Sequence, residues 1–151
     1  MGRFETEVLT EPDHVEALMD LSGNWIDRVR ERKPMRELIL DLDSSVSETY
    51  GSQEGTAYNG HFNCTCYHPL FCFNQFGDLE RALLREGNVH SADDWHSVLE
   101  PVVARYRDAN FRRYFRGDAA FANPDIYRLL EAQDYFYVIR LKGNNILHGH
   151  I

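Results

Sequence analysis

The sequence has no apolar run long enough to cross a membrane, because a spanning helix needs about 20 such residues in succession. Its N-terminus, MGRFETEV, is charged and lacks the apolar segment of a secretory signal. Cysteine is scarce, and Cys64, Cys66 and Cys72 are odd in number and too closely spaced for a disulfide framework. We therefore expect no membrane partner and a location in the reducing cytoplasm.

Positive charge is also in short supply. Lys and Arg number 16 against 24 Asp and Glu, which gives a formal net charge of −8 and a pI near 5.3. Proteins that bind nucleic acids are usually basic, because phosphate contacts dominate their affinity, so this balance counts against a nucleic-acid ligand. The objection is weaker for an enzyme that binds metal ions through carboxylates, since the cations reverse the local field.

The basic residues that are present gather in two groups, Arg28 to Lys33 and Arg105 to Arg116. Each group fits a solvated charged face and a phosphate-contacting surface equally well. The rest of the composition, 43% hydrophobic and 26% charged, is that of a folded domain, and 151 residues suffice for one hydrophobic core.

Apolar spacing predicts a helix over residues 10–30, begun by a capping-box variant of Thr10 and Asp13 with Pro12 in the first turn. A strand is predicted over 37–46, and its apolar run indicates burial on both faces. Alternation along this strand places its acids on one face and its leucines on the other.

Residues 47–63 are polar and contain three glycines, which predicts a loop or a loosely formed hairpin. An apolar and aromatic run follows over 64–73, and 74–78 read as a turn. Residues 79–84 have helical propensity, but the preceding turn favours a returning strand.

The second half predicts a helix capped by Ser91, with Pro101 kinking it or starting a new segment. A strand over 111–117 leads to Asp118, and Asn123 before a proline marks the next helix. The last strand covers 135–141. This order predicts an α/β fold, a mixed sheet with helices on its faces.

Two acids follow buried strands at their carboxyl ends, Asp43 and Asp118. Ligands of open α/β sheets bind at that edge, and paired carboxylates suit Mg²⁺, a hard cation. Asp41 lies on the same face as Asp43 and is the alternative first acid. An Asp after a strand is also a common turn former, so spacing alone leaves the metal site open.

The segments LDLDSSVSETYG, residues 40–51, and YFRGDAAFANPD, residues 114–125, resemble insertion-sequence transposases of the DDE class. Asp43-Ser44-Ser45 matches the family's Asp-x-(Ser/Thr), and Arg116-Gly117-Asp118 matches its Arg-x-Asp. The resemblance implies a ribonuclease-H-like fold with Asp43 and Asp118 as the first two catalytic acids. It also implies Mg²⁺ or Mn²⁺ as cofactor and metal-dependent cleavage and strand transfer of DNA.

The family's third acid is a Glu on a helix well downstream of the second Asp. Glu131 lies on the wrong element, so we expect the third acid outside this chain, the catalytic sheet incomplete and the chain alone inactive. We divide the sequence into an N-terminal helical segment, 1–36, and a partial catalytic domain, 37–151.

The implied partners are element ends and target DNA, and a second copy in a homo-oligomer. Candidate DNA contacts are Arg112, Arg113 and Arg116 together with Tyr58 and Asn59, although Asn59-Gly60 also fits a tight turn. An alternative function is an inactive transposase remnant that binds DNA or protein.

A separate hypothesis concerns zinc. His61, Cys64, Cys66 and His68 are zinc-ligand types within a short stretch, but their spacing is not that of a zinc finger. The competing interpretation is a strand with buried cysteines, because a free Cys packs as a small hydrophobic residue.

Overall fold

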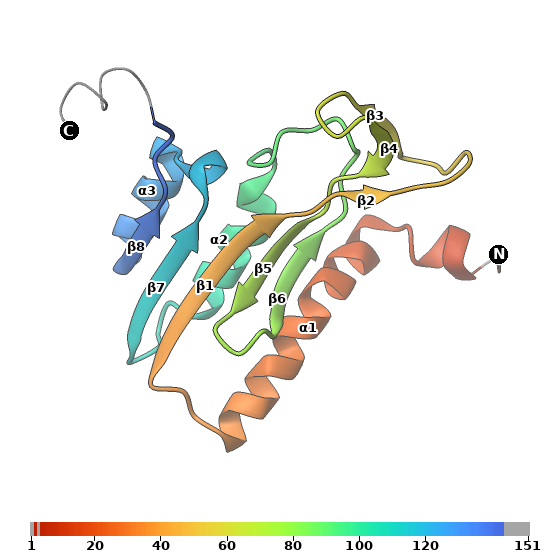
Figure 1. Cartoon of the computed structure of the whole chain (residues 1–151). Helices are drawn as coiled ribbons and strands as arrows, with labels where there is room; N and C mark the ends of the chain where they lie inside the picture. The colour runs from red at the N-terminus through yellow and green to blue at the C-terminus, as the bar shows by residue number, and fades with distance from the viewer. Residues whose placement is uncertain (1, 3, 144–151) are drawn as a thin grey trace.

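The computed structural model describes residue 2 and residues 4–143, which form two sheets and the helices around them (Figure 1). The larger sheet has the strand order β6-β5-β1-β7-β8, and the smaller one the order β2-β4-β3. A short π-helical turn, Phe4–Val8, precedes helix α1, Pro12–Arg32. None of the helices in these described residues is long and apolar enough to span a membrane.

The larger sheet is mixed, as the sequence predicts. Strands β1 (Glu37–Ser44), β5 (Leu70–Asn74) and β6 (Leu79–Leu83) are antiparallel neighbours. Strands β7 (Arg112–Gly117) and β8 (Tyr135–Ile139) run parallel to β1. Helix α2 (Trp95–Arg105) connects β6 to β7, and a 3₁₀ turn (Ala119–Phe121) and α3 (Pro124–Ala132) connect β7 to β8. This is the predicted ribonuclease-H-like order.

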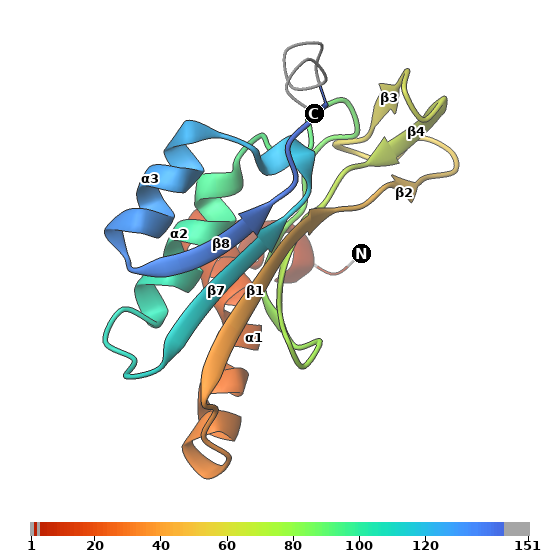
Figure 2. The same cartoon turned by 60° about the vertical axis from the view of Figure 1, so that its left-hand side comes forward.

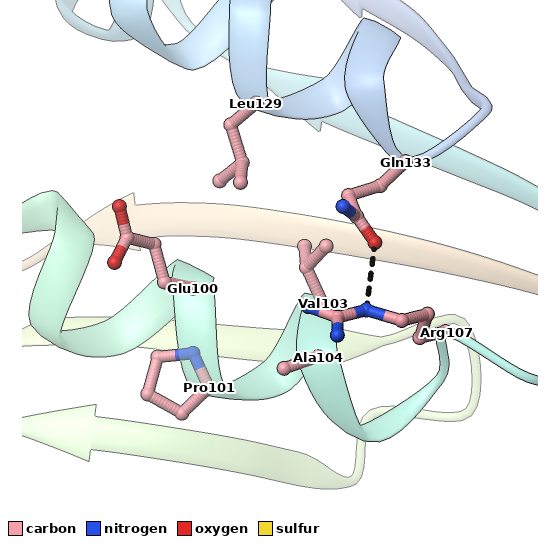
Figure 3. Close-up of a pocket in the computed structure, with 7 residues that line it drawn as sticks. All are labelled: Glu100, Pro101, Val103, Ala104, Arg107, Leu129 and Gln133. Atoms are coloured by element: carbon pink, nitrogen blue, oxygen red, sulfur yellow. Dashed lines mark hydrogen bonds between the residues drawn. The ribbon is translucent and has the colours of Figure 1, made fainter.

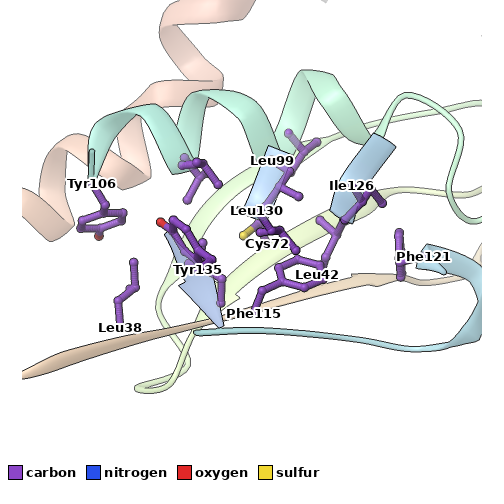
Figure 4. Close-up of a cluster of buried hydrophobic side chains, with 14 of the residues drawn as sticks. Leu38, Leu42, Cys72, Leu99, Tyr106, Phe115, Phe121, Ile126, Leu130 and Tyr135 are labelled. Atoms are coloured by element: carbon purple, nitrogen blue, oxygen red, sulfur yellow. The ribbon is translucent and has the colours of Figure 1, made fainter. Parts of the chain in front are cut away.

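Strand β1 lies at the centre of the sheet, and its leucines at 38, 40 and 42 are buried. They pack with α2 and α3 in one hydrophobic cluster, which includes Phe115 and Ile126 (Figure 4). The other face of β1 is only partly covered, so the prediction of burial on both faces is wrong. Helices α2 and α3 cover only the face of β1 that carries the leucines.

That second face of the sheet is apolar as well as open. Phe136 and Val138 of β8 are 62% and 75% exposed, and the Phe136 ring stacks on Tyr114 of β7. Ile39 joins them in lining a shallow cavity of about 270 Å³. The sheet therefore presents uncovered hydrophobic side chains beside its two parallel strands.

Helix α1 packs against the edge strand β6 (Figure 1). The Arg81 side chain of β6 is buried and forms ion pairs with Glu16 and Asp20 of α1. The N-cap of α1 is Glu11 rather than Thr10, and the Glu11 side chain makes no capping hydrogen bond, which corrects the predicted capping box of Thr10 and Asp13.

Helix α2 begins later than its sequence predicts. Its N-cap is Asp94, in the left-handed conformation with φ of 54°, and not Ser91. Pro101 lies inside one continuous helix, so the predicted second segment does not form. Asn123 caps α3 as predicted, and its side chain accepts a hydrogen bond from the Asp125 N–H.

The polar stretch after β1 does not form a hairpin of its own. Strands β2 (Ser47–Glu48) and β3 (Ala57–Asn59) both pair with β4 (Cys64–Tyr67), which lies between them. The apolar run predicted over 64–73 is divided at Pro69 between β4 and β5, which belong to different sheets. Proline lacks the N–H that a continuous ladder needs.

Candidate active site

Strands β1 and β7 carry the candidate acids, and their parallel register brings these acids to the same level. Asp41 lies opposite Arg116, and Leu42 lies opposite Gly117. Asp43 directly follows Leu42, and Asp118 directly follows Gly117. Neighbouring strands of a sheet are about 4.8 Å apart. The two aspartates, 75 positions apart in the sequence, therefore meet at the carboxyl edge of the sheet.

That edge is hollowed. Asp41, Asp43, Arg116 and Asp118 line one open cavity of about 460 Å³, together with Leu42 and Gly117. Figure 2 shows the carboxyl ends of β1, β7 and β8 at the same end of the sheet, where the smaller sheet begins. The cavity therefore opens where ligands of α/β sheets usually bind.

Backbone N–H groups hold both candidate carboxylates in place. Asp43 Oδ1 accepts a hydrogen bond from the Ser44 N–H at 2.8 Å, and Asp118 Oδ1 accepts one from the Ala120 N–H at 2.8 Å. No second bond to either carboxylate is recorded among the described residues. Each aspartate thus keeps one oxygen, a hard ligand, available to a cation.

Asp41 differs from them because a guanidinium occupies both of its oxygens. Arg116 Nε and Nη2 each donate a hydrogen bond to Asp41, at 2.6 Å. These bonds, and then the charge of Asp41, raise the pKa of Arg116. From the sequence, Arg116 is a candidate DNA contact and part of the Arg-x-Asp match, and its pair with Asp41 is not predicted. The parallel register of Asp41 with Arg116 is the signal that identifies the pair.

The other predicted DNA contacts lie in different places. Arg112 begins β7, opposite Glu37 and at the far end of the strand from Asp118. Arg113 Nη1 donates hydrogen bonds to the Tyr106 and Arg107 carbonyls, so its side chain caps the C-terminal end of α2. These two arginines are not brought to the acids.

Tyr58 and Asn59 lie on β3 of the smaller sheet. Tyr58 is exposed, whereas the Asn59 side chain is engaged at both ends. Its Nδ2 donates to the Gly87 carbonyl, and its Oδ1 accepts from the His61 and Phe62 N–H groups. Asn59 therefore organises the loop that follows β3.

Several members of the two basic groups are neutralised inside the protein. Arg30 pairs with Asp78 at 2.7 Å, and Arg105 pairs with the fully buried Glu80. These two arginines are therefore structural charges, and neither a solvated face nor a phosphate contact describes them.

The zinc hypothesis finds no support in this geometry. Over the part of the chain that the structure describes, no three His, Cys, Asp or Glu side chains are grouped to hold a metal ion. Cys66 is buried, and His68 Nδ1 lies 3.1 Å from the Val89 carbonyl. Cys66 therefore packs as a small hydrophobic side chain in this sheet. The same result applies to the cavity lined by Asp41, Asp43 and Asp118, which we call the acid cavity. Its described acids supply a pair of candidate metal ligands, Asp43 and Asp118, and not a group of three.

A further cavity of about 330 Å³ lies between α2 and α3 (Figure 3). Arg107 Nε donates to Gln133 across it at 3.2 Å, and Leu129 and Val103 line it. Glu100 is its only carboxylate among the described residues. It lacks the paired acids of the sheet edge.

A family model described as Transposase DDE domain group 1 matches residues 1–151. A mixed sheet with two aspartates at the ends of adjacent parallel strands fits a catalytic domain of that class. The chain belongs to this DDE transposase family. No curated protein sequence matches it.

The fold is similar to that of several transposases of known structure. The piggyBac transposase synaptic complex with hairpin DNA has 13% identity and a TM-score of 0.50, over 74% of this chain and 24% of that one. The catalytic domain of Mos1 mariner transposase has 11% identity and a TM-score of 0.48, over 86% and 61%. A pre-cleavage Mos1 transpososome has 15% identity and a TM-score of 0.43, over 81% and 42%. The chain thus spans less than two thirds of each of these proteins, and at these identities the likeness concerns the fold alone.

Proposed function

We propose that this chain is the catalytic core of an insertion-sequence DNA transposase that performs metal-dependent strand cleavage and strand transfer. The observation that carries the proposal is the meeting of Asp43 and Asp118 at one open cavity, in a member of the DDE transposase family. The proposed substrates are the element ends and a target DNA, in keeping with the hairpin DNA of the piggyBac complex.

The donor set of the cavity fits Mg²⁺ or Mn²⁺. Both ions prefer carboxylate oxygens, and Asp43 and Asp118 each retain one such oxygen. When bound, such an ion supplies charge stabilisation for phosphoryl transfer. Asp43 and Asp118 would hold it, because their other oxygens are fixed by backbone N–H groups.

The remaining residues of the cavity would place DNA and limit charge. Arg116 cancels the charge of Asp41, so that two net carboxylates face the substrate rather than three. Its guanidinium is 58% exposed and is a proposed phosphate contact. Tyr58, Arg112 and Arg113 stay weaker proposals for DNA contacts, since none of them lines this cavity.

The test is Mn²⁺ binding by isothermal titration calorimetry to the parent chain and to Asp43→Asn and Asp118→Asn. We expect each substitution to weaken binding at least about tenfold, because each removes one of two charged ligands. Asp41→Asn is the comparison, and it should weaken binding less than either of these, because it removes no free ligand oxygen but leaves the Arg116 charge unpaired beside the site. Loss of binding in Asp41→Asn alone would make Asp41 the first acid, and equal binding by all four proteins would overturn the site.

The alternative function is a transposase remnant that binds DNA or protein without cutting. Two observations favour it. The described part of the site contains only two acids that no cation neutralises, and the chain has a net charge of −8. Incubation of supercoiled plasmid with the chain and Mn²⁺ distinguishes the two functions. Nicking that Asp118→Asn abolishes would exclude the remnant, whereas metal binding with no nicking, even by a longer chain that includes the predicted third acid, would favour it.

We also propose a cytoplasmic homo-oligomer. The three cysteines are free thiols, as in a reducing compartment. Helix α1 exposes apolar side chains at Val15, Leu18, Trp25 and Val29, at spacings of three, seven and four. This spacing forms a seam that suits a second helix.

The charges of α1 favour a second copy in antiparallel orientation. Its first half carries Asp13, Glu16 and Asp20 and no Lys or Arg, and Arg81 pairs with the last two of these. Its second half carries Arg28, Arg30 and Arg32 beside Asp27 and Glu31, and Arg30 pairs with Asp78. The charges left for a partner therefore include Asp13 at one end and Arg28 and Arg32 at the other. Antiparallel pairing of two copies would place the acidic half of each on the basic half of the other. A two-fold interface of this kind closes on itself and buries the seam.

A further inference from the structure

A second polar cavity, of about 400 Å³, lies near the smaller sheet. We call it the histidine pocket, and it is lined by Asn59, His61, Phe62, His68, Val89, His90, Ser91 and Lys142. It is formed by the loop after β3, the end of β4, the segment before α2 and the segment after β8. Figure 2 shows these segments at the end of the molecule where β1 and β7 reach their carboxyl ends.

The lining of the histidine pocket carries one positive charge, that of Lys142, and is rich in hydrogen-bond donors. Three imidazoles, one ammonium group and the Ser91 hydroxyl surround it, and none of its described lining residues is an Asp or Glu. In a chain with 24 acidic residues, a pocket with an ammonium group and no carboxylate among its described lining residues suits an anion. A carboxylate does contact the backbone of one lining residue, because Asp93 Oδ2 accepts a hydrogen bond from the His90 N–H at 2.7 Å.

The walls of the pocket are built on two buried polar side chains. His68 is only 3% exposed, and its Nδ1 lies 3.1 Å from the Val89 carbonyl, which leaves Nε2 as the free ring nitrogen of a lining residue. Arg85 is 5% exposed and donates from Nε to the His68 carbonyl and from Nη1 to the His90 and Ser91 carbonyls. Arg85 thereby fixes both sides of the pocket.

Arg85 also retains an unused donor. Its Nη2 is buried and has no hydrogen-bond partner in the described structure. A buried guanidinium N–H without an acceptor is costly, and Arg85 lies behind the lining of the pocket, where the charges of Asp94 and Asp93 act on it. The guanidinium adds a positive charge directly behind the segment that carries His90 and Ser91.

We propose that the histidine pocket binds a phosphate group, and that this phosphate belongs to the backbone of the DNA on which the acid cavity acts. Lys142, His61 and His90 would contact the phosphate oxygens, and Ser91 would donate from its hydroxyl. The assignment to DNA rests on the proposed function, whereas the affinity for phosphate rests on the pocket alone. The site would fix the register of the strand relative to Asp43 and Asp118.

The first experiment titrates inorganic phosphate into the uniformly ¹⁵N-labelled chain and follows the histidine ring nitrogens by long-range ¹H–¹⁵N spectra. We expect shifts for His61, His68 and His90, and no shift for His96, which is exposed on α2. Unchanged pocket resonances up to high phosphate concentration would overturn the proposal.

The second experiment measures binding of a short duplex DNA by fluorescence anisotropy at several salt concentrations. The double variant His61→Ala/His90→Ala should bind at least about tenfold more weakly, with a salt slope reduced by about one phosphate contact. Both side chains are exposed, so the fold should persist, and His96→Ala is the matched control.

The outcomes separate the two sources of phosphate. If phosphate shifts the histidines but the double variant binds DNA as the parent does, the pocket takes a free phosphate and the assignment to DNA is wrong. Failure of the proposed function would appear instead as unchanged Mn²⁺ binding in Asp43→Asn and Asp118→Asn, residues that the histidine pocket does not share.

Discussion

At the scale of single residues, Asp41 and Asp43 look equivalent in the sequence but have different partners in the acid cavity. Asp41 and Asp43 lie two positions apart on one face of β1, yet only Asp41 lies opposite an arginine. The bidentate pair with Arg116 uses both of its oxygens, whereas Asp43 is bound through one. Position along a strand selects the face, and the neighbouring strand then decides which carboxylate stays available.

Two buried weak acids make the fold sensitive to alkali. Burial raises the pKa of Cys72 from 9.0 to about 12, and burial also raises the pKa of Tyr106 from 10.0 to about 12. The unfolded chain would lose these protons at lower pH than the folded one. Their stabilisation is therefore complete below about pH 9 and is lost as pH rises towards 12.

We predict that the free energy of unfolding falls by a few kcal/mol between pH 8 and pH 11. Urea unfolding at a series of pH values, followed by circular dichroism, measures this change. Cys72→Val removes one of the two groups and should flatten the decline between pH 9 and pH 11. A stability that stays constant or increases over this range would contradict the assignment.

At the scale of elements, one buried carboxylate joins helix, sheet and helix. Glu80 of β6 is fully buried, and it accepts from Asn74 of β5, from Tyr106 after α2 and from Arg105 of α2. Arg105 also pairs with Asp27 of α1 at 3.7 Å. A charge of this kind is tolerated only when it is paired and hydrogen-bonded.

Gly23 of α1 is required by this network. A Cβ at position 23 would collide with the Arg105 guanidinium, which lies against the helix backbone there. The glycine that weakens the middle of α1 by propensity thus makes room for the cation that neutralises Glu80.

Gly23→Ala should therefore destabilise the protein, although glycine to alanine in a helix ordinarily stabilises by about 1 kcal/mol. We expect a loss of about 1–3 kcal/mol, because displacement of Arg105 leaves Glu80 buried with a weaker partner. Chemical denaturation measures the difference. Asn24→Ala, an exposed neighbour in the same helix, is the control and should be neutral or stabilising. A more stable Gly23→Ala variant would show that Arg105 does not need this space.

Local patterns predicted most of the elements correctly. The turn at 74–78 correctly outweighed the helical propensity of 79–84, which forms β6. The errors lie where tertiary contacts decide: Pro69 divides one apolar run between two sheets, and α2 begins at Trp95 because Arg85 binds the backbone of the segment before it.

The candidate site was predictable only in part. Asp43 and Asp118 could be found because both follow buried strands and match family motifs. The Asp41–Arg116 pair needed the parallel register, and the histidine pocket needed four segments that are distant in sequence. Side-chain periodicity within a strand does not contain information of that kind.

At the scale of the whole molecule, hydrophobic surface is exposed on two sides. The open sheet face presents Phe136 and Val138, and α1 presents the seam from Val15 to Val29. Large uncovered apolar patches usually mark contacts with other chains. The two surfaces differ in that only the seam has complementary charges at its ends.

We predict that the chain self-associates through antiparallel α1 helices. Such pairing would set Leu18 against Val29 and the small Ser22 against Trp25, which is 59% exposed in the single chain. Sedimentation velocity should detect dimers whose proportion increases with concentration. Leu18→Glu and Trp25→Glu should each shift the protein to monomer, because they bury a charge in the seam.

The control is Tyr50→Glu, a substitution at an 83% exposed side chain after β2, which should leave the dimer intact. The seam should also respond to salt, since opposed acidic and basic halves attract less strongly when screened. Monomers of the parent chain at all concentrations would overturn the pairing. Dimers that persist in both glutamate variants would indicate that the copies associate through the open face of the sheet instead. Val138→Lys is the corresponding test of that interface.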